Sequence, residues 1–293
     1  MSFEPSERSC PICSQKALYV GKRSGNLDSR EFRYFHCASC RFSFVGDPRQ
    51  DYAEIYSEAY YKGHGADRLV DYVYELENPD RTVRNYEWQG VLTIFKELCP
   101  QGGKWLDFGC GAGGLVRFAR THGMDAVGFE EGWGANAARG VGIPVLRANE
   151  LEEYVGHFDF VTAIEVFEHI ADPISAFQQI RKLLKPGGKL FLTTGNARPW
   201  RERLLDWSYT SVPEVHISFY EPETLSYAMN AAGLKSQPGE FFHGFSDIIK
   251  FKVLKTLKFK NKSLAADLLP WSLLTKIVDA KYQTSAQPYG VAI

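Results

Sequence analysis

The most informative feature of this sequence is a regular alternation of strand-like and helix-like segments from Lys104 onward. Short apolar runs bounded by turns alternate with segments of helical spacing, a pattern typical of βαβ units and a mostly parallel sheet. We expect strands at 104–108, 125–129, 143–147, 158–164 and 189–194, with helices near 113–122, 133–140, 150–155 and 173–185. Strands from Leu234 and at Tyr289–Ile293 would complete a seven-stranded, Rossmann-like α/β sheet with helices on both faces. The predicted domain spans 101–293 and carries a helical insertion near 245–280.

The first predicted strand leads into a glycine-rich loop at residues 109–114, which opens a helix. Gly109, Gly111 and Gly114 satisfy the G-x-G-x-x-G pattern of dinucleotide sites, so the glycines alone leave the cofactor open. Asp107 favours a cationic ligand such as S-adenosylmethionine, because a carboxylate at this place would repel a pyrophosphate. Glu130 ends the second strand, where a carboxylate can accept hydrogen bonds from ribose hydroxyls of either cofactor.

Four segments together resemble successive motifs of class I S-adenosylmethionine-dependent methyltransferases. They are Asp107–Gly114, Gly128–Glu130, Phe158–Val161 and Leu184–Gly188, and the resemblance covers residues 81–236. The run from Ile164 to Pro173 is similar to the small-molecule branch, which includes ubiquinone-pathway O-methyltransferases and sugar methyltransferases. The resemblance implies methyl transfer to a small-molecule acceptor, such as a sugar nucleotide or a phenolic or polyketide-like compound.

The same resemblance assigns the cofactor contacts residue by residue. It implies that the methionine moiety lies against Asp107, Gly109, Gly111 and Gly113, the ribose against Glu130, the adenine near Ala148 and Asn149, and the methyl donor beside Glu165.

Acidic and histidine residues follow the fourth and fifth strands. Glu165, Glu168 and His169 form an E-x-x-E-H cluster, which the resemblance to ubiquinone-pathway enzymes associates with a divalent metal. The alternative is that His169 caps the strand-to-helix junction. His216 is the predicted general base, because an imidazole with a pKa near ~6.5 suits proton abstraction. Tyr220 is a second candidate, and a structural histidine bonded to a loop carbonyl is the alternative for His216.

Two C-x-x-C pairs near the start predict a metal site. Cys10, Cys13, Cys37 and Cys40 can complete a closed tetrahedral zinc site, which leaves no position for a reactive water. We therefore expect a structural zinc ribbon in residues 1–50. A redox dithiol and four unrelated buried thiols are the alternatives.

Residues 51–100 predict a helical linker that acts as a substrate or cofactor lid, with a tyrosine-rich start around Tyr60. Asn78 followed by Pro79 predicts the start of a helix. The lysine-rich segment 250–262 holds no acidic residue, so it could touch a membrane surface or an anionic, lipid-linked acceptor. The alternative is a surface helix with solvated lysines.

The overall charge excludes a general polyanion-binding surface, because 34 basic and 35 acidic side chains give a net charge of -1. Nucleic acid is therefore not an expected partner, although a zinc ribbon could bind RNA and make the chain an RNA-binding protein or RNA methyltransferase. The start of the chain lacks a basic and then apolar leader, so we expect a cytoplasmic protein.

Overall fold

The computed structural model describes residues 6–66, 68, 70–236, 243–271, 273–274 and 290–292. Within these ranges the larger sheet has six strands in the order β11-β9-β8-β5-β6-β7. Its parallel strands are β5 (Lys104–Phe108), β6 (Asp125–Phe129), β7 (Val145–Leu146), β8 (Phe158–Ile164) and β9 (Leu184–Thr193). At one edge β11 (Gly290–Ala292) runs antiparallel to β9. This confirms the expected Rossmann-like sheet, while the continuation of the strand predicted from Leu234 lies outside the described residues.

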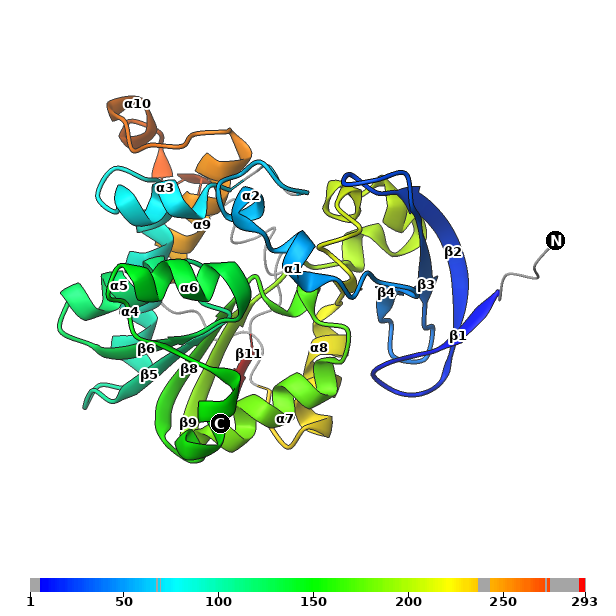
Figure 1. The fold of residues 1–293 in the computed structure, drawn as a ribbon, viewed down its shortest axis with the longest axis horizontal. Helices are drawn as coiled ribbons and strands as arrows, with labels where there is room; N and C mark the ends of the chain where they lie inside the picture. Colours follow the sequence, from blue (N-terminus) through cyan, green and yellow to red (C-terminus); the bar gives the residue numbers. More distant parts are fainter. Residues whose placement is uncertain are drawn as a thin grey trace.

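Helices cover both faces of this sheet (Figure 1). Side chains alternate between the faces along each strand. Trp105, Phe160 and Phe191 join one core and Leu106 and Val161 the other. The first core includes residues of α4 (Arg84–Leu98), α5 (Gly114–Thr121), α6 (Gly132–Gly140) and α9 (Phe245–Thr256), and the second includes residues of α7 (Pro173–Leu183) and α8 (Pro222–Ala231). The remaining short helices include α10 (Leu264–Asp267) and the 3-10 turns η1 (Ala148–Tyr154), η2 (Phe167–His169), η3 (Arg198–Asp206) and η4 (Ser208–Ser211).

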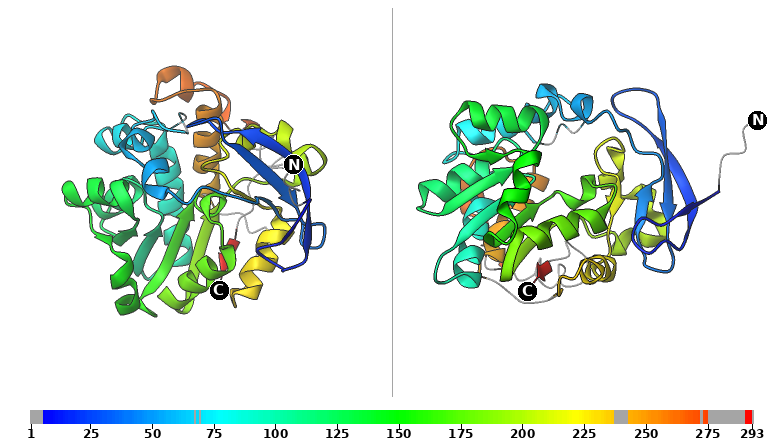
Figure 2. Two further views of the ribbon diagram at one scale, coloured as in Figure 1. Left: turned by 45° about the vertical axis from the view of Figure 1, so that its right-hand side comes forward. Right: turned by 60° about the horizontal axis from the view of Figure 1, so that its bottom comes forward.

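The N-terminal ribbon is an antiparallel sheet at one side of the molecule (Figure 2). Its strands are β1 (Glu7–Ser9), β2 (Lys16–Ser24), β3 (Glu31–His36) and β4 (Ser43–Val45). A fifth strand, β10 (Ser218–Phe219), pairs with β4 although it comes from the far part of the chain. The ribbon is therefore not confined to residues 1–50, because the later domain completes its sheet.

The cap between ribbon and sheet consists of α1 (Tyr52–Ile55), α2 (Glu58–Tyr61), α3 (Tyr72–Glu77) and the start of α4. The helix start predicted at Asn78 is wrong, because Asn78 is the C-cap of α3 and α4 begins at Arg84. Backbone pairing with the segment after α9 explains the difference. The Val83 amide donates to the Lys260 carbonyl, and the Lys262 amide donates to the carbonyl of Arg81, so these residues cannot continue a helix.

The lysines of α9 do not form the exposed basic face that the sequence suggested. The Lys252 side chain is 10% exposed and lies 3.2 Å from Glu165 Oε1 and 3.4 Å from Glu87 Oε1. Lys250 lies over the Tyr86 ring and pairs with Asp267 at 3.2 Å. Both lysines have partners inside the protein, so contact with a membrane or a lipid-linked acceptor stays a prediction that this geometry does not support. Among the described helices, none has the length and apolar character needed to cross a membrane.

Candidate functional site

A cavity of about 1190 Å³ lies between the cap and the ends of β5, β6 and β8. The glycine loop after β5 forms part of its wall, including Gly109 and Gly111. Gly109 has a φ of 78°, and an added Cβ would lie 2.5 Å from Val166 Cγ2. A side chain at this position would therefore be strained and would collide with the opposite wall.

Two buried acids stand beside this loop. Asp107 accepts a hydrogen bond of 2.7 Å from Thr162 Oγ1, and burial raises its pKa to about 7, with a smaller contribution from Glu130. The Glu130 carboxylate accepts hydrogen bonds from the backbone amides of Gly111, at 3.0 Å, and Glu131, at 2.9 Å. Burial also raises the pKa of Glu130. This part of the cavity wall carries acidic groups, which favours a cationic ligand.

The predicted cofactor residues are mostly brought together. Asp107, Gly109, Gly111, Glu130, Ala148 and Glu165 all line the cavity. In the part of the chain that the structure describes, the cavity wall does not include Gly113 or Asn149. Gly113 is the N-cap of α5, and Asn149 is exposed on η1.

Glu165 lies in a buried network of charges that the sequence did not reveal. Burial alone would raise its pKa, but Lys252 and Lys255 outweigh that effect and lower it to about 2. Glu87, which Lys252 also contacts, accepts a hydrogen bond of 2.6 Å from Arg84. Glu87, Arg84 and Glu165 all line the cavity, so this network forms one of its ends. No local pattern marks Lys252, because its partners lie on distant segments.

A second polar cluster contains the other predicted chemical residues. His169 lines the cavity, and its Nδ1 lies 2.9 Å from the carbonyl oxygen of Val215 and 3.3 Å from Tyr56 Oη. Because a carbonyl can only accept, the Nδ1 carries the proton in that contact. Burial lowers the pKa of His169 to about 3 and, together with Glu165, raises that of Glu168 to about 8.

His216 lies behind His169 rather than in the cavity wall. Its Nδ1 is 2.8 Å from the carbonyl oxygen of Tyr209, and its ring centroid is 5.2 Å from that of His169. Glu168, His169 and His216 offer ligand atoms within 4.8 Å of one another. The divalent metal therefore stays a prediction, and this cluster contains His216 in place of Glu165.

Tyr220 is not brought to the cavity. It is fully buried, its hydroxyl donates to the Phe167 carbonyl at 3.1 Å, and its ring lies 5.1 Å from that of Phe42. These contacts connect the ribbon to the main core, which gives Tyr220 a packing role.

Tyrosines from the cap form much of the opposite wall. The lining residues from the cap include Tyr52, Tyr56, Tyr60, Tyr61 and Tyr72, and the lid role expected for this segment stays a prediction. The Tyr56 and Tyr60 rings meet edge to face at 5.1 Å, and the Tyr60 and Tyr72 rings stack at 5.9 Å. This wall can hold an aromatic ring in several orientations.

The four N-terminal cysteines gather at one point of the ribbon. Their sulfur atoms lie within 4.8 Å of one another, with 3.5 Å between Cys10 and Cys40 and 3.5 Å between Cys13 and Cys37. Tetrahedral zinc with Zn–S bonds of about 2.3 Å requires sulfur atoms about 3.8 Å apart. The donor set and its spacing therefore fit one zinc ion.

Comparison with known proteins identifies relatives for the central part of the chain. The family model described as "Methyltransferase domain" matches residues 80–237. The ubiquinone biosynthesis O-methyltransferase of Pseudomonas aeruginosa (strain UCBPP-PA14) is 36% identical over 108 residues, which cover 33% of this chain and 47% of that protein. The protein of the same name from Acinetobacter baylyi is 31% identical over 153 residues, 46% of this chain and 64% of that protein.

The chain therefore spans about half to two thirds of the length of these curated relatives. Among solved structures, human N-acetylserotonin methyltransferase in complex with SAM aligns with a TM-score of 0.47 and 17% identity. That alignment covers 67% of this chain and 57% of the other.

Proposed function

Because the chain belongs to the methyltransferase domain family, whose model covers residues 80–237, we propose that it transfers a methyl group from S-adenosylmethionine to a small phenolic acceptor. One observation carries this proposal: a single cavity has buried acids on one wall and tyrosines on another. The acidic wall fits the positive charges of the cofactor, and the tyrosine wall fits an aromatic ring.

The residues present fit the cofactor. Asp107 and the glycine loop would hold the methionine moiety, Glu130 would bind the ribose and Ala148 would lie near the adenine. The bound cofactor supplies an electrophilic methyl group on a sulfonium. The protein contributes by holding the acceptor in line with that group, which accounts for a large part of the rate of such displacements.

The cavity favours a phenol over a sugar nucleotide. Arg84 and Lys182 are the basic residues among the described residues that line it. Arg84 is bound to Glu75 at 3.1 Å and Glu87 at 2.6 Å, which leaves the exposed Lys182 as the main positive charge for a diphosphate. The similarity to ubiquinone biosynthesis O-methyltransferases also supports an oxygen acceptor.

His169 is the base that the cavity geometry favours. Because Nδ1 donates to Val215, Nε2 is the ring nitrogen that can accept a proton. Burial lowers the pKa of His169, which keeps the ring neutral but weakens it as a base. His216, the base expected from the sequence, lies behind His169 and would act through it. We expect His169→Ala and His216→Ala to lower turnover roughly 10²-fold while S-adenosylhomocysteine still binds. Normal turnover in His216→Ala would leave that residue a structural one.

Transfer of a labelled methyl group tests the function directly. We expect label in catechols and other phenols, and not in sugar nucleotides or RNA. A separate titration should show S-adenosylhomocysteine binding that is lost in Glu130→Ala and kept in Glu153→Ala, a matched change of an exposed acid. Tight NADH binding would contradict the cofactor assignment, and transfer only to sugar nucleotides or RNA would contradict the acceptor.

We also propose that Cys10, Cys13, Cys37 and Cys40 hold a structural zinc ion, on the basis of their spacing. Stoichiometric zinc in the purified protein, and a lower unfolding temperature in the Cys10→Ser/Cys37→Ser variant, are expected. A zinc-free protein with unchanged stability in that variant would refute the site. All six cysteines are unpaired, which fits the proposed cytoplasmic location.

A further inference from the structure

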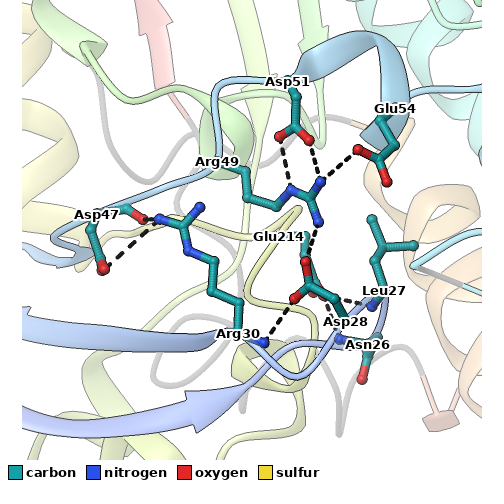
Figure 3. Close-up of polar contacts among 9 residues, drawn as sticks. All are labelled: Asn26, Leu27, Asp28, Arg30, Asp47, Arg49, Asp51, Glu54 and Glu214. Atoms are coloured by element: carbon teal, nitrogen blue, oxygen red, sulfur yellow. Dashed lines mark hydrogen bonds and ion pairs between the residues drawn. The ribbon is translucent and has the colours of Figure 1, made fainter.

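The turn between β2 and β3 of the ribbon, residues 25–30, lies where the cap meets the segment before β10. Figure 3 shows its polar contacts, which come from both of those parts of the chain. Arg49 connects the turn to α1, and Glu214 connects it to the segment that follows η4. The turn is thus held between α1, which contributes Tyr52 and, at its C-cap, Tyr56 to the cavity wall, and the segment that follows η4.

Arg49 binds three carboxylates with one guanidinium group. Its side chain is only 9% exposed, and it lies 2.9 Å from Asp28 Oδ2 on the turn and 2.7 Å from Glu54 Oε2 on α1. It also forms a two-pronged contact with Asp51, the N-cap of α1. Charge-assisted contacts of this kind are stronger than neutral ones and set a definite geometry. Arg49 therefore fixes the position of α1, which carries Tyr52, relative to the ribbon turn.

Glu214 holds the turn from the other side. The residue is 2% exposed, and its Oε1 accepts hydrogen bonds from the backbone amides of Asn26 and, at 2.8 Å, Leu27. The Asn26 side chain donates in turn to the Ser211 carbonyl at 3.0 Å. A buried carboxylate is costly unless it is hydrogen-bonded, so the bonds to Oε1 favour the docked position of the turn, while Oε2 has no hydrogen-bond partner among the described residues.

One of these contacts leads to Tyr56, which lines the cavity, and the other leads to Val215, which bonds His169, a second lining residue. Tyr56 is the C-cap of α1, and Val215 follows Glu214 directly. The Val215 carbonyl accepts from His169, whose Nδ1 lies 3.3 Å from Tyr56 Oη. A displacement of the turn would therefore disturb both sides of this contact.

We propose that Arg49 and Glu214 are positioning residues, which hold the ribbon turn from two sides and thereby fix Tyr56 and His169 in the acceptor half of the cavity. This inference rests on the proposed function, because it assigns that half of the cavity to the acceptor. It also gives the ribbon a role in acceptor binding that does not require any ribbon residue to touch the acceptor.

Hydrogen exchange of the full-length protein provides the test. In Arg49→Gln and Glu214→Ala we expect roughly tenfold faster exchange in residues 52–61 and 207–217, and unchanged exchange in β5 and β8. Glu214→Gln keeps a carbonyl acceptor and should fall between Glu214→Ala and the unchanged protein. Lys22→Gln is the matched control, because it breaks an exposed ion pair with Glu31 on the same hairpin.

Binding measurements separate positioning from general stability. The affinity for S-adenosylhomocysteine should stay within about twofold in the Arg49 and Glu214 variants, while KM for a catechol should rise roughly tenfold, the effect of one lost charge-assisted hydrogen bond. Unchanged exchange in both segments would overturn the inference, as would equal acceleration across the whole chain. The exchange measurement needs no acceptor, so it decides this inference even if no phenol is methylated. A failure to methylate any phenol would contradict the proposed function and not this inference.

Discussion

Replacing Lys252 by methionine removes a buried cation that lies between Glu87 and Glu165. Methionine is unbranched and only one atom shorter than lysine, so it keeps most of the apolar stem and the change mainly removes charge. The carboxylates of Glu87 and Glu165 then remain buried with less positive charge nearby to balance their negative charge. The unfolding free energy should fall, since removal of one partner of a buried ion pair leaves an uncompensated charge.

The pKa of Glu165 sets the scale of this loss. It is about 2, compared with an ordinary value of 4.5, because Lys252 and Lys255 outweigh the effect of burial. A difference of that size corresponds to about 3 kcal/mol for the combined effect of Lys252, Lys255 and burial. This agrees with the roughly 3–5 kcal/mol typical of broken buried ion pairs. For a domain of this size the unfolding temperature should fall by roughly 6–12 °C.

The pH dependence gives a more specific expectation. In the unchanged protein the folded pKa of Glu165 is lowered, so its contribution is present above pH 4.5 and is lost as the pH falls toward 2. In Lys252→Met, only Lys255 is left among the two lysines to oppose burial, so the pKa of Glu165 rises and protonation costs the folded protein less as the pH falls. The stability difference between the two proteins should therefore be smaller at pH 5 than at pH 8.

Scanning calorimetry across this pH range measures the difference. Lys258→Met is a matched control, because Lys258 is an exposed lysine just after the same helix and should change stability by less than about 0.5 kcal/mol. Adding Glu165→Gln to Lys252→Met should recover part of the loss. An unfolding temperature equal to that of the unchanged protein, or a difference independent of pH, would refute this reasoning.

Three further predictions concern the cavity and its surroundings. Burial places the pKa of Asp107 at about 7, so the affinity for S-adenosylmethionine, measured by calorimetry, should rise roughly tenfold from pH 6 to pH 8. If the Asp107→Asn variant shows the same rise, Asp107 is not its source. Gly109→Ala should weaken S-adenosylhomocysteine binding at least tenfold. The control Gly140→Ala, where an added Cβ meets nothing within 4 Å, should bind normally, and equal affinities of the two variants would show that the loop tolerates a side chain. Tyr220→Phe loses the hydrogen bond to Phe167, so its free energy of unfolding should be about 1 kcal/mol lower while its turnover is unchanged. A lower turnover with unchanged stability would show that Tyr220 takes part in the reaction.

The sheet and the glycine loop were predictable because their signals are local. Apolar runs with intervening helical spacing place β5, β6 and β8, and the parallel pairing of β5 with β6 brings Asp107 near Glu130 at one edge of the sheet. Parallel neighbours with short connections leave little freedom in how these residues meet. The half of the cavity that we propose for the cofactor is therefore the part that sequence motifs could predict.

The rest depended on contacts between distant segments. Asn78 and Pro79 carry a sound local signal for a helix start, but backbone pairing of residues 81–83 with the segment after α9 overrides it. Lys252 looked like part of a basic surface because nothing near it in sequence shows that Glu87 and Glu165 lie opposite. His216 was recognised by residue type alone, and only the packing of Tyr209 shows that it lies behind His169.

The pairing of β10 with β4 has a consequence for synthesis on the ribosome. The ribbon emerges first, yet β4 keeps an open edge until Ser218 and Phe219 have been translated. Open strand edges are templates for pairing with other chains, although a short strand such as β4 limits that risk. A fragment ending near residue 50 would carry this edge permanently, and it should therefore self-associate more readily than the chain of residues 1–293.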